Sequence, residues 1–220
     1  MIHAGTTIVF QGDSITDTGR DRERREANDA EALGRGYALM CAGRLLANHP
    51  GDGLKIFNRG VAGDQVTQLQ ARWKADCLDL KPDVLSVLIG VNDCWHGVAK
   101  GEPQNGTTLD QYERVYREIL DDARAQNPKL HLVLIEPFVT ETSPVTEMNF
   151  HPDLDQRRGI AREVCGEFGG LWIPAQTILD DAVAAGAGPA DVCFDGVHPT
   201  PLGHGLIADA WIRAVDAAWG

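Results

Sequence analysis

Short apolar runs alternate along the chain with longer stretches in which apolar residues recur at helical spacing. This alternation predicts parallel strands joined by crossover helices, hence an α/β fold. Two of the runs are almost entirely apolar, which indicates central strands covered on both faces. The predicted strands are residues 7–11, 54–57, 84–89, 130–135 and, more weakly, 171–173.

Apolar stripes between these runs predict the helices. One stripe begins at Val66 and ends at Cys77, and a longer one begins at Leu109 and ends at Ala123. Thr108 resembles the start of a capping box for the second helix, which Asn127 and the following proline should end. Further helices are predicted near residues 36–48, 153–168 and 202–217.

Residues 20–31 carry many charges of both signs and almost no apolar side chain, so this segment is interpreted as a solvated loop. The alternative is that the loop shapes a substrate site. The sequence contains no internal repeat, low-complexity tract or interdomain linker. Its length of 220 residues suits one α/β domain, and a single domain over residues 1–220 is therefore expected.

Charge and cysteine content narrow the function classes. The net charge of −12 disfavours nucleic acid and anionic membrane surfaces as partners, and it is compatible with a neutral ester of a sugar. The five cysteines have no metal-site spacing, which favours reduced thiols in the cytoplasm over disulfides. If Met1 is the native start, the absence of a leader pattern predicts a soluble, unexported protein.

The first candidate for chemistry is Ser14, which directly follows the first predicted strand in the motif Gly-Asp-Ser-Ile-Thr. In open α/β sheets, ligands bind beyond the carboxyl ends of the strands, so a serine at this place can meet a substrate. Asp13 and its glycine neighbour also suit a plain turn, which is the alternative interpretation. Ser14 needs a base to act as a nucleophile.

Asp195 and His198 are the candidate partners, in the motif Asp-Gly-Val-His-Pro near the end of the chain. A turn with this spacing can bring the carboxylate to one ring nitrogen while the other faces outward. Two further segments follow predicted strands and contain Gly63 and Asn92. A bare backbone N–H and a side-chain amide are suitable donors to the oxyanion that develops during acyl transfer.

Together these four blocks resemble the SGNH (GDSL-type) hydrolases, in order and across nearly the whole chain. The resemblance implies a three-layer α/β/α sandwich, flavodoxin-like, with a five-stranded parallel sheet. It also implies a triad of Ser14, Asp195 and His198. The oxyanion hole would comprise the Ser14 N–H, the Gly63 N–H and the Asn92 side chain, with Gly60 as the competing glycine. No metal or organic cofactor is implied.

Longer stretches around Gly12–Arg20, Leu33–Tyr37, Ala71–Trp73 and Gly90–Trp95 resemble intracellular SGNH acetylxylan esterases. An acetylated xylo-oligosaccharide or another small ester is therefore the expected substrate. One departure is Phe194, because a tryptophan commonly stands before the aspartate in that pattern; the change alters a wall of the expected pocket.

Asp13, Arg59, Trp95 and Phe194 are the candidate substrate contacts. For Arg59 the alternative is a surface ion pair, and for Trp95 it is core packing. Trp219 could cover the edge of a site or an oligomer interface, and assembly into a closed homo-oligomer is compatible with such an enzyme.

Three other functions remain as alternatives. A broad short-chain esterase, thioesterase or lysophospholipase would use the same triad. A non-catalytic carbohydrate-binding module would not need Ser14, Asp195 and His198 together. A flavodoxin-like phosphate or flavin binder would need a glycine-rich phosphate loop, and neither common form of that motif occurs in a suitable context.

Overall fold

The structure, a computed structural model, describes residues 2–219. Five parallel strands form one sheet in the order β2-β1-β3-β4-β5. This is the flavodoxin-like order, in which the chain reverses direction across the sheet between β1 and β3. The strands are β1 (Thr7–Gly12), β2 (Lys55–Asn58), β3 (Val84–Leu88), β4 (His131–Ile135) and β5 (Leu171–Ile173).

Each predicted strand is confirmed within about a residue at either end. The three central strands β1, β3 and β4 are buried almost throughout, whereas the edge strands β2 and β5 are partly exposed. The helices are α1 (Ser14–Asp17), α2 (Ala30–Leu33), α3 (Tyr37–Asn48), α4 (Val66–Ala71), α5 (Trp73–Asp76), α6 (Val91–Trp95), α7 (Leu109–Gln126), α8 (Ser143–Thr146), α9 (Asp153–Glu167), α10 (Ala175–Ala184), α11 (Pro189–Val192) and α12 (Pro201–Trp219). Short 3-10 turns lie at Leu78–Leu80, Val98–Lys100 and Pro103–Asn105.

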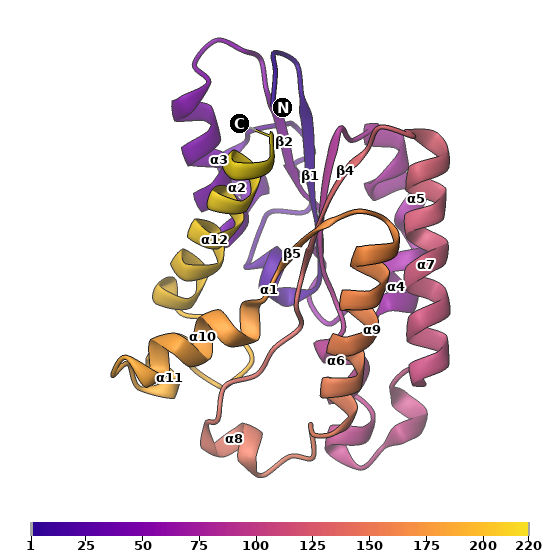
Figure 1. The fold of residues 1–220 in the computed structure, drawn as a ribbon, viewed down its shortest axis with the longest axis vertical. Helices are drawn as coiled ribbons and strands as arrows, with labels where there is room; N and C mark the ends of the chain where they lie inside the picture. The colour runs from indigo at the N-terminus through magenta and orange to yellow at the C-terminus, as the bar shows by residue number, and fades with distance from the viewer. Residues whose placement is uncertain (1, 220) are drawn as a thin grey trace.

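Helices cover both faces of the sheet, which gives three layers (Figure 1). One apolar core lies between the sheet and α3, α10 and α12, and the other lies between the sheet and α4, α7 and α9. The predicted three-layer α/β/α sandwich is therefore confirmed. No helix among residues 2–219 is long and apolar enough to cross a membrane.

Two helical predictions need correction. The stripe from Val66 to Cys77 is buried as expected, but it belongs to two short helices, because the backbone leaves the helical region at Arg72 (φ −106°, ψ 4°). Helix α10 was not among the predicted helices. The predicted cap of α7 is present, with the Gln111 N–H donating to Thr108 Oγ1 at 3.1 Å, and Asn127 ends that helix.

Candidate active site

Ser14 lies at the carboxyl edge of the sheet, where β1 ends and α1 begins. Asp13 caps α1, because its Oδ1 accepts a hydrogen bond of 3.0 Å from the Ile15 N–H. The cap turns the chain sharply and leaves the Ser14 side chain half-buried at the first helical position. Ser14 thus occupies the reversal point between β1 and β3, where open α/β sheets bind their ligands.

His198 and Asp195 belong to the loop that precedes α12, and they reach Ser14 from the far end of the chain. Ser14 Oγ lies 2.8 Å from His198 Nε2. His198 Nδ1 lies 2.7 Å from Asp195 Oδ2. The structure therefore brings together the three side chains that the sequence selects as a triad, with both distances in the hydrogen-bonding range.

The Asp195 carboxylate is fixed by its own loop. Its Oδ1 accepts hydrogen bonds from the backbone N–H groups of Val197 (2.9 Å) and His198 (2.7 Å). Burial alone raises the pKa of Asp195, but the hydrogen bonds from the backbone and side chain of His198 and from Val197 outweigh it, so the pKa lies below its ordinary value. Asp195 is consequently charged at neutral pH and holds the imidazole in one orientation.

Three N–H donors lie on the loops around Ser14. Asn92, 2% exposed, lies in the first turn of α6 after β3, and its Nδ2 donates to the Asp64 carbonyl at 3.1 Å. This bond uses one amide hydrogen and leaves the second available. Gly63 adopts a positive φ of 86°, and its N–H meets no acceptor within residues 2–219. The Ser14 N–H is likewise without an acceptor in the described chain, as is usual for the first turn of a helix.

Aromatic rings flank His198 on two sides. The Phe194 ring stacks on the imidazole, with centroids 5.7 Å apart and planes 16° apart, and 63% of Phe194 is exposed. Trp95 approaches the same imidazole at 5.8 Å, and its Nε1–H donates to Met148 Sδ at 3.1 Å. Phe194 therefore presents a ring to the solvent beside Ser14, whereas Trp95 is half-buried and packs partly into the core.

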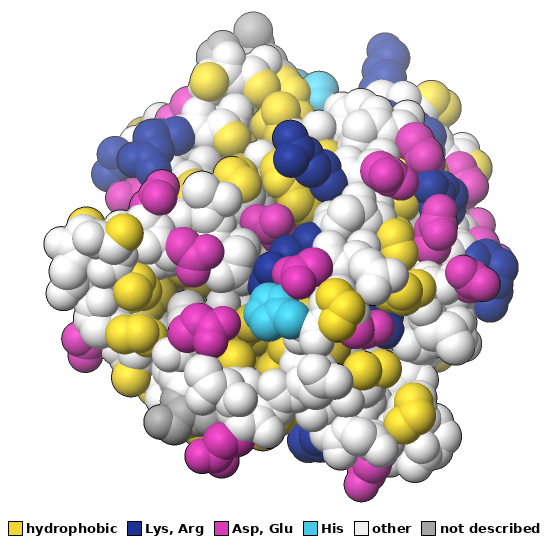
Figure 2. All heavy atoms as spheres, turned by 60° about the horizontal axis from the view of Figure 1, so that its bottom comes forward, with side chains coloured by type: hydrophobic (Ala, Val, Ile, Leu, Met, Phe, Trp, Pro, Cys, Tyr) yellow, Lys and Arg dark blue, Asp and Glu magenta, His cyan; other side chains and the backbone are white. Residues whose placement is uncertain are grey.

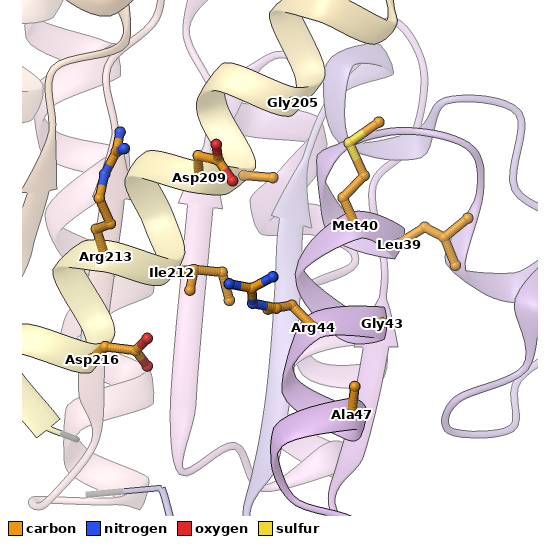
Figure 3. A pocket seen from close by; sticks show the side chains of 11 residues that line it. Leu39, Met40, Gly43, Arg44, Ala47, Gly205, Asp209, Ile212, Arg213 and Asp216 are labelled. Carbon is orange, nitrogen blue, oxygen red and sulfur yellow. The ribbon is translucent and has the colours of Figure 1, made fainter.

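Two hollows are relevant to a substrate. A pocket of about 250 Å³ lies against Ser14 and His198, and its other lining residues are Ile15, Thr18, Phe194, Pro199 and His204. A larger groove of about 690 Å³ runs between α3 and α12 (Figure 3). The larger groove contains Arg44, Asp209 and Arg213 but no part of the Ser14 site, so its size does not make it the reaction site. Figure 2, which turns the carboxyl edge of the sheet forward, shows histidine, acidic, basic and hydrophobic side chains gathered at the middle of that face.

The placement of Asp13 and Arg59 corrects the expectation that they contact substrate. Asp13 is 1% exposed, and burial raises its pKa to about 7. Arg59 is 3% exposed; its guanidinium lies over the Phe57 ring at 5.2 Å and donates to the Arg25 carbonyl at 2.8 Å. Neither side chain lines the pocket beside Ser14, and within residues 2–219 Arg59 forms no ion pair, although a surface ion pair was the alternative expectation for it.

Residues 20–31 are mostly exposed, as expected, but the segment also supports the site. Arg20 Nε donates to the Gly60 carbonyl at 2.7 Å, and Arg22 pairs with Asp17. Asp17 Oδ2 in turn accepts the Ala62 N–H at 3.0 Å. The segment therefore braces the loop that carries Gly63. Among residues 2–219, the segment forms no hydrogen bond or ion pair with a residue that lines the pocket beside Ser14.

Two ionic groups, the half-buried Arg72 and the buried Asp93, also shape the site. Arg72 Nε pairs with Asp64 at 2.6 Å, and its NH1 and NH2 donate to the carbonyls of Arg59 and Gly12 at 2.6 and 3.0 Å. The Asp93 carboxylate accepts the Val66 N–H at 3.1 Å, and burial raises its pKa to about 6. Neither residue was assigned a role from the sequence, because the partners of both side chains lie on other loops of the fold.

Among the remaining candidates, Trp219 lies away from the site, because its ring packs on His131 with centroids 4.4 Å apart at the edge that begins the strands. His96 follows Trp95 in the chain, and its Nδ1 lies 3.4 Å from Gln65 Nε2. His204 lies on the last helix, as its place in the sequence indicates, and it also lines the pocket beside Ser14, which the sequence did not reveal.

A parallel sheet in this order, with a serine, an imidazole and a carboxylate joined at its carboxyl edge, defines the class as an α/β/α hydrolase with a serine nucleophile. Comparisons with known proteins agree. The model of the GDSL-like Lipase/Acylhydrolase family matches residues 10–206. The chain therefore belongs to this family and is an SGNH-type serine esterase.

The relatives support the assignment over the full chain. The acetylxylan esterase of Geobacillus stearothermophilus is 31% identical over 220 residues, which cover 99% of this chain and 97% of that protein. A Parabacteroides merdae protein described as a GDSL-like lipase has a TM-score of 0.89 at 39% identity, with 98% of each chain covered. A variant of the Geobacillus acetyl-xylooligosaccharide esterase has a TM-score of 0.85 at 31% identity, covering 97% of this chain and 95% of that one. Catalytic mutants of the Geobacillus enzyme replace a serine or a histidine by alanine.

Proposed function

We propose that this esterase removes acetyl groups from acetylated carbohydrates through an acyl-serine intermediate. The observation that carries the proposal is the continuous hydrogen-bonded chain from Ser14 Oγ through His198 to Asp195, with steps of 2.8 and 2.7 Å. A serine hydroxyl becomes nucleophilic only when a base of this kind takes its proton.

The chain's own groups suffice for each proton transfer. Ser14 Oγ attacks the ester carbonyl while His198 Nε2 accepts the hydroxyl proton, and Asp195 stabilises the resulting imidazolium. His198 then donates this proton to the departing sugar oxygen as the carbon–oxygen bond breaks. A water molecule attacks the acyl-serine by the same sequence, which releases acetate and restores the Ser14 hydroxyl.

The oxyanion would be stabilised by the N–H groups of Ser14 and Gly63 and by the amide of Asn92. Gly63 is preferred over Gly60, because the Gly60 N–H already donates to Asn58 Oδ1 at 2.9 Å. A side chain at Gly60 would also place its Cβ 2.4 Å from the Asp17 N, so that glycine is explained by close packing alone. The hydrogen bond from Asn92 to the Asp64 carbonyl holds its amide before substrate arrives, which is how an effective oxyanion donor is prepared.

Two observations support a carbohydrate ester as substrate. The exposed Phe194 ring beside Ser14 offers an aromatic face on which a sugar ring can stack. The Geobacillus relative is an acetylxylan esterase, so acetylated xylo-oligosaccharides are the first substrates to assay.

The test begins with Ser14→Ala, measured on acetylated xylo-oligosaccharides and on p-nitrophenyl acetate. We expect loss of nearly all turnover on both, with a circular dichroism spectrum and melting temperature like those of the parent. Labelling of the parent by a fluorophosphonate, absent from the variant, would identify Ser14 as the nucleophile. Near-parental turnover by Ser14→Ala would overturn the mechanism. Faster hydrolysis of octanoyl than acetyl esters would instead assign a lipase-type substrate to the same triad.

A further inference from the structure

His204 lies in the first turn of α12, directly beside the proposed reaction centre. It is 4% exposed and lines the pocket of about 250 Å³ together with Ser14 and His198. Nothing in the proposed mechanism uses His204, although the ring is close enough to His198 for the two to interact electrostatically. The contacts of this buried imidazole indicate what role it can have beside the reaction centre.

The contacts of His204 fix both the position and the tautomer of the ring. The Tyr37 N–H donates to His204 Nδ1 at 3.3 Å, so Nδ1 carries the lone pair and the ring hydrogen must sit on Nε2. The ring stacks on Tyr37 with centroids 6.4 Å apart and planes 19° apart. Gly36 permits this approach, because a Cβ there would lie 2.8 Å from His204 Cε1.

His204 stays neutral over the pH range in which the enzyme would work. Burial and, to a smaller extent, the neighbouring His198 together lower its pKa to about 4. The Nε2–H group has no acceptor within residues 2–219. Unlike polar atoms such as Asp13 Oδ2, Nε2 is not completely enclosed by the described chain. One edge of this pocket-lining ring is therefore anchored to the backbone, and the opposite edge carries an N–H donor that is free to bind a ligand.

The rest of the pocket is almost free of polar groups. Ile15, Pro199 and Phe194 contribute carbon surface, and Thr18 Oγ1 is occupied by its own bond to the Ile15 carbonyl at 3.0 Å. A hydrogen-bond donor in such surroundings strongly favours a ligand that supplies an acceptor, because an apolar ligand would leave the N–H unpaired.

The pocket borders His198 but neither Gly63 nor Asn92. His198 has to protonate the leaving oxygen, so the alcohol part of the ester lies on this side, and the carbonyl oxygen lies toward the two oxyanion donors. We propose that this pocket binds the leaving alcohol, and that His204 Nε2–H donates to a hydroxyl oxygen of that alcohol. The inference rests on the proposed function and deepens it, because it makes a polyhydroxylated leaving group the preferred substrate.

His204→Asn is the informative variant. The shorter Asn Oδ1 can still accept the Tyr37 N–H, so the local fold keeps its bond, but no donor reaches the position of Nε2. His204→Gln is the rescue variant, because a glutamine amide can place an N–H near that position. His131→Gln serves as a remote control, since His131 lies at the opposite edge of the sheet beside Trp219.

The assay compares kcat/KM for three kinds of ester. They are a mono-acetylated methyl xyloside, its singly deoxygenated analogues, and phenyl acetate. Phenyl acetate is the control substrate, because its leaving group has no second oxygen. In the parent, removal of the bonded hydroxyl should lower kcat/KM about tenfold, the effect of one hydrogen bond. For His204→Asn, kcat/KM on the xyloside should fall about tenfold relative to the parent. Removing the bonded hydroxyl from the substrate should then cause no further fall in kcat/KM. Phenyl acetate should stay within about twofold in every variant, and His204→Gln should recover most of the loss.

An equal fall on xyloside and phenyl acetate would assign His204 a structural role and overturn the inference. Unchanged discrimination against the deoxygenated analogues in His204→Asn would overturn it as well. Both outcomes are separable from failure of the proposed function, because that failure appears as turnover of phenyl acetate by Ser14→Ala.

Discussion

Replacing Asp195 by asparagine is the sharpest test of how the imidazole is held. Asparagine keeps one side-chain oxygen, which can still accept the backbone N–H groups of Val197 and His198 that now bond Asp195 Oδ1 at 2.9 and 2.7 Å. The amide nitrogen then faces His198 Nδ1, in place of the carboxylate oxygen now at 2.7 Å. Because two N–H groups cannot face each other, His198 must carry its hydrogen on Nε2, where it can no longer accept a proton from Ser14.

The expected loss in kcat for Asp195→Asn is about 10⁴-fold, the size that a wrong tautomer costs in a serine triad. This corresponds to about 5.4 kcal/mol of transition-state stabilisation. The assay is hydrolysis of p-nitrophenyl acetate under saturating conditions, with KM measured alongside. The melting temperature should stay near that of the parent, since the loop keeps its two backbone bonds. Retention of more than a tenth of the parental kcat by a folded Asp195→Asn would refute the assigned role of Asp195.

Asp195→Ala separates the stability of the loop from the chemistry. Loss of the bonds at Oδ1 should cost about 1–3 kcal/mol of unfolding free energy at pH 7. The pKa of Asp195 lies below its ordinary value of 3.8 in the folded protein, so its stabilisation is fully present above that value. The stability difference between parent and Asp195→Ala should therefore shrink as the pH falls below about 4. A difference that grows on acidification would contradict the sign of the pKa shift.

Two further substitutions test other parts of the structure. Asn92→Ala should lower kcat about a hundredfold with little change in KM, because one oxyanion donor is lost only in the transition state; exposed Asn149→Ala is the control, and a change in KM alone would contradict this role. Arg157→Met should cost about 3–5 kcal/mol in urea unfolding, because the fully buried guanidinium bonds Asp153 at 2.7 Å and the Thr107 carbonyl at 2.6 Å. Arg162→Met on the exposed side of the same helix should change the unfolding free energy by less than about 0.5 kcal/mol, and equal effects of the two variants would contradict the argument.

The sequence predicted the sheet well because a strand covered on both faces leaves a local signature. Residues 84–89 and 130–135 are apolar except for Ser86 and His131, and such short apolar runs are typical of strands inside a parallel sheet. The flavodoxin-like arrangement of the strands was expected from the resemblance to a family and not from the runs themselves. Helix α10 gave a weaker pattern, in which acidic residues interrupt the apolar ones, and it was missed.

Buried charges were the main failure of prediction, for a physical reason. Arg157 reaches Thr107 across 50 positions of sequence, and Arg72 reaches Gly12 across 60. Such a side chain looks like any exposed arginine until its partners are folded around it. Asp13 and Arg59 were mispredicted for the same reason. Both were expected to contact the substrate, but both side chains are buried. His204 gave no local signal either, since its partner Tyr37 lies 167 positions away.

These distant bonds explain how four separate loops can keep one geometry. Asn92 donates to the Asp64 carbonyl, and its neighbour Asp93 accepts the Val66 N–H, so the loop after β3 is tied at two points to the loop after β2. Arg72 binds the Gly12 carbonyl and thereby connects the same region to the end of β1, one residue before the cap of the Ser14 helix. In each of these hydrogen bonds a side chain bonds a backbone group, and the backbone group is present whatever non-proline residue stands at its position. The placement of the proposed oxyanion donors relative to Ser14 therefore depends on a few buried side chains, and a change at Arg72 or Asp93 should act on kcat through geometry although neither residue touches the substrate.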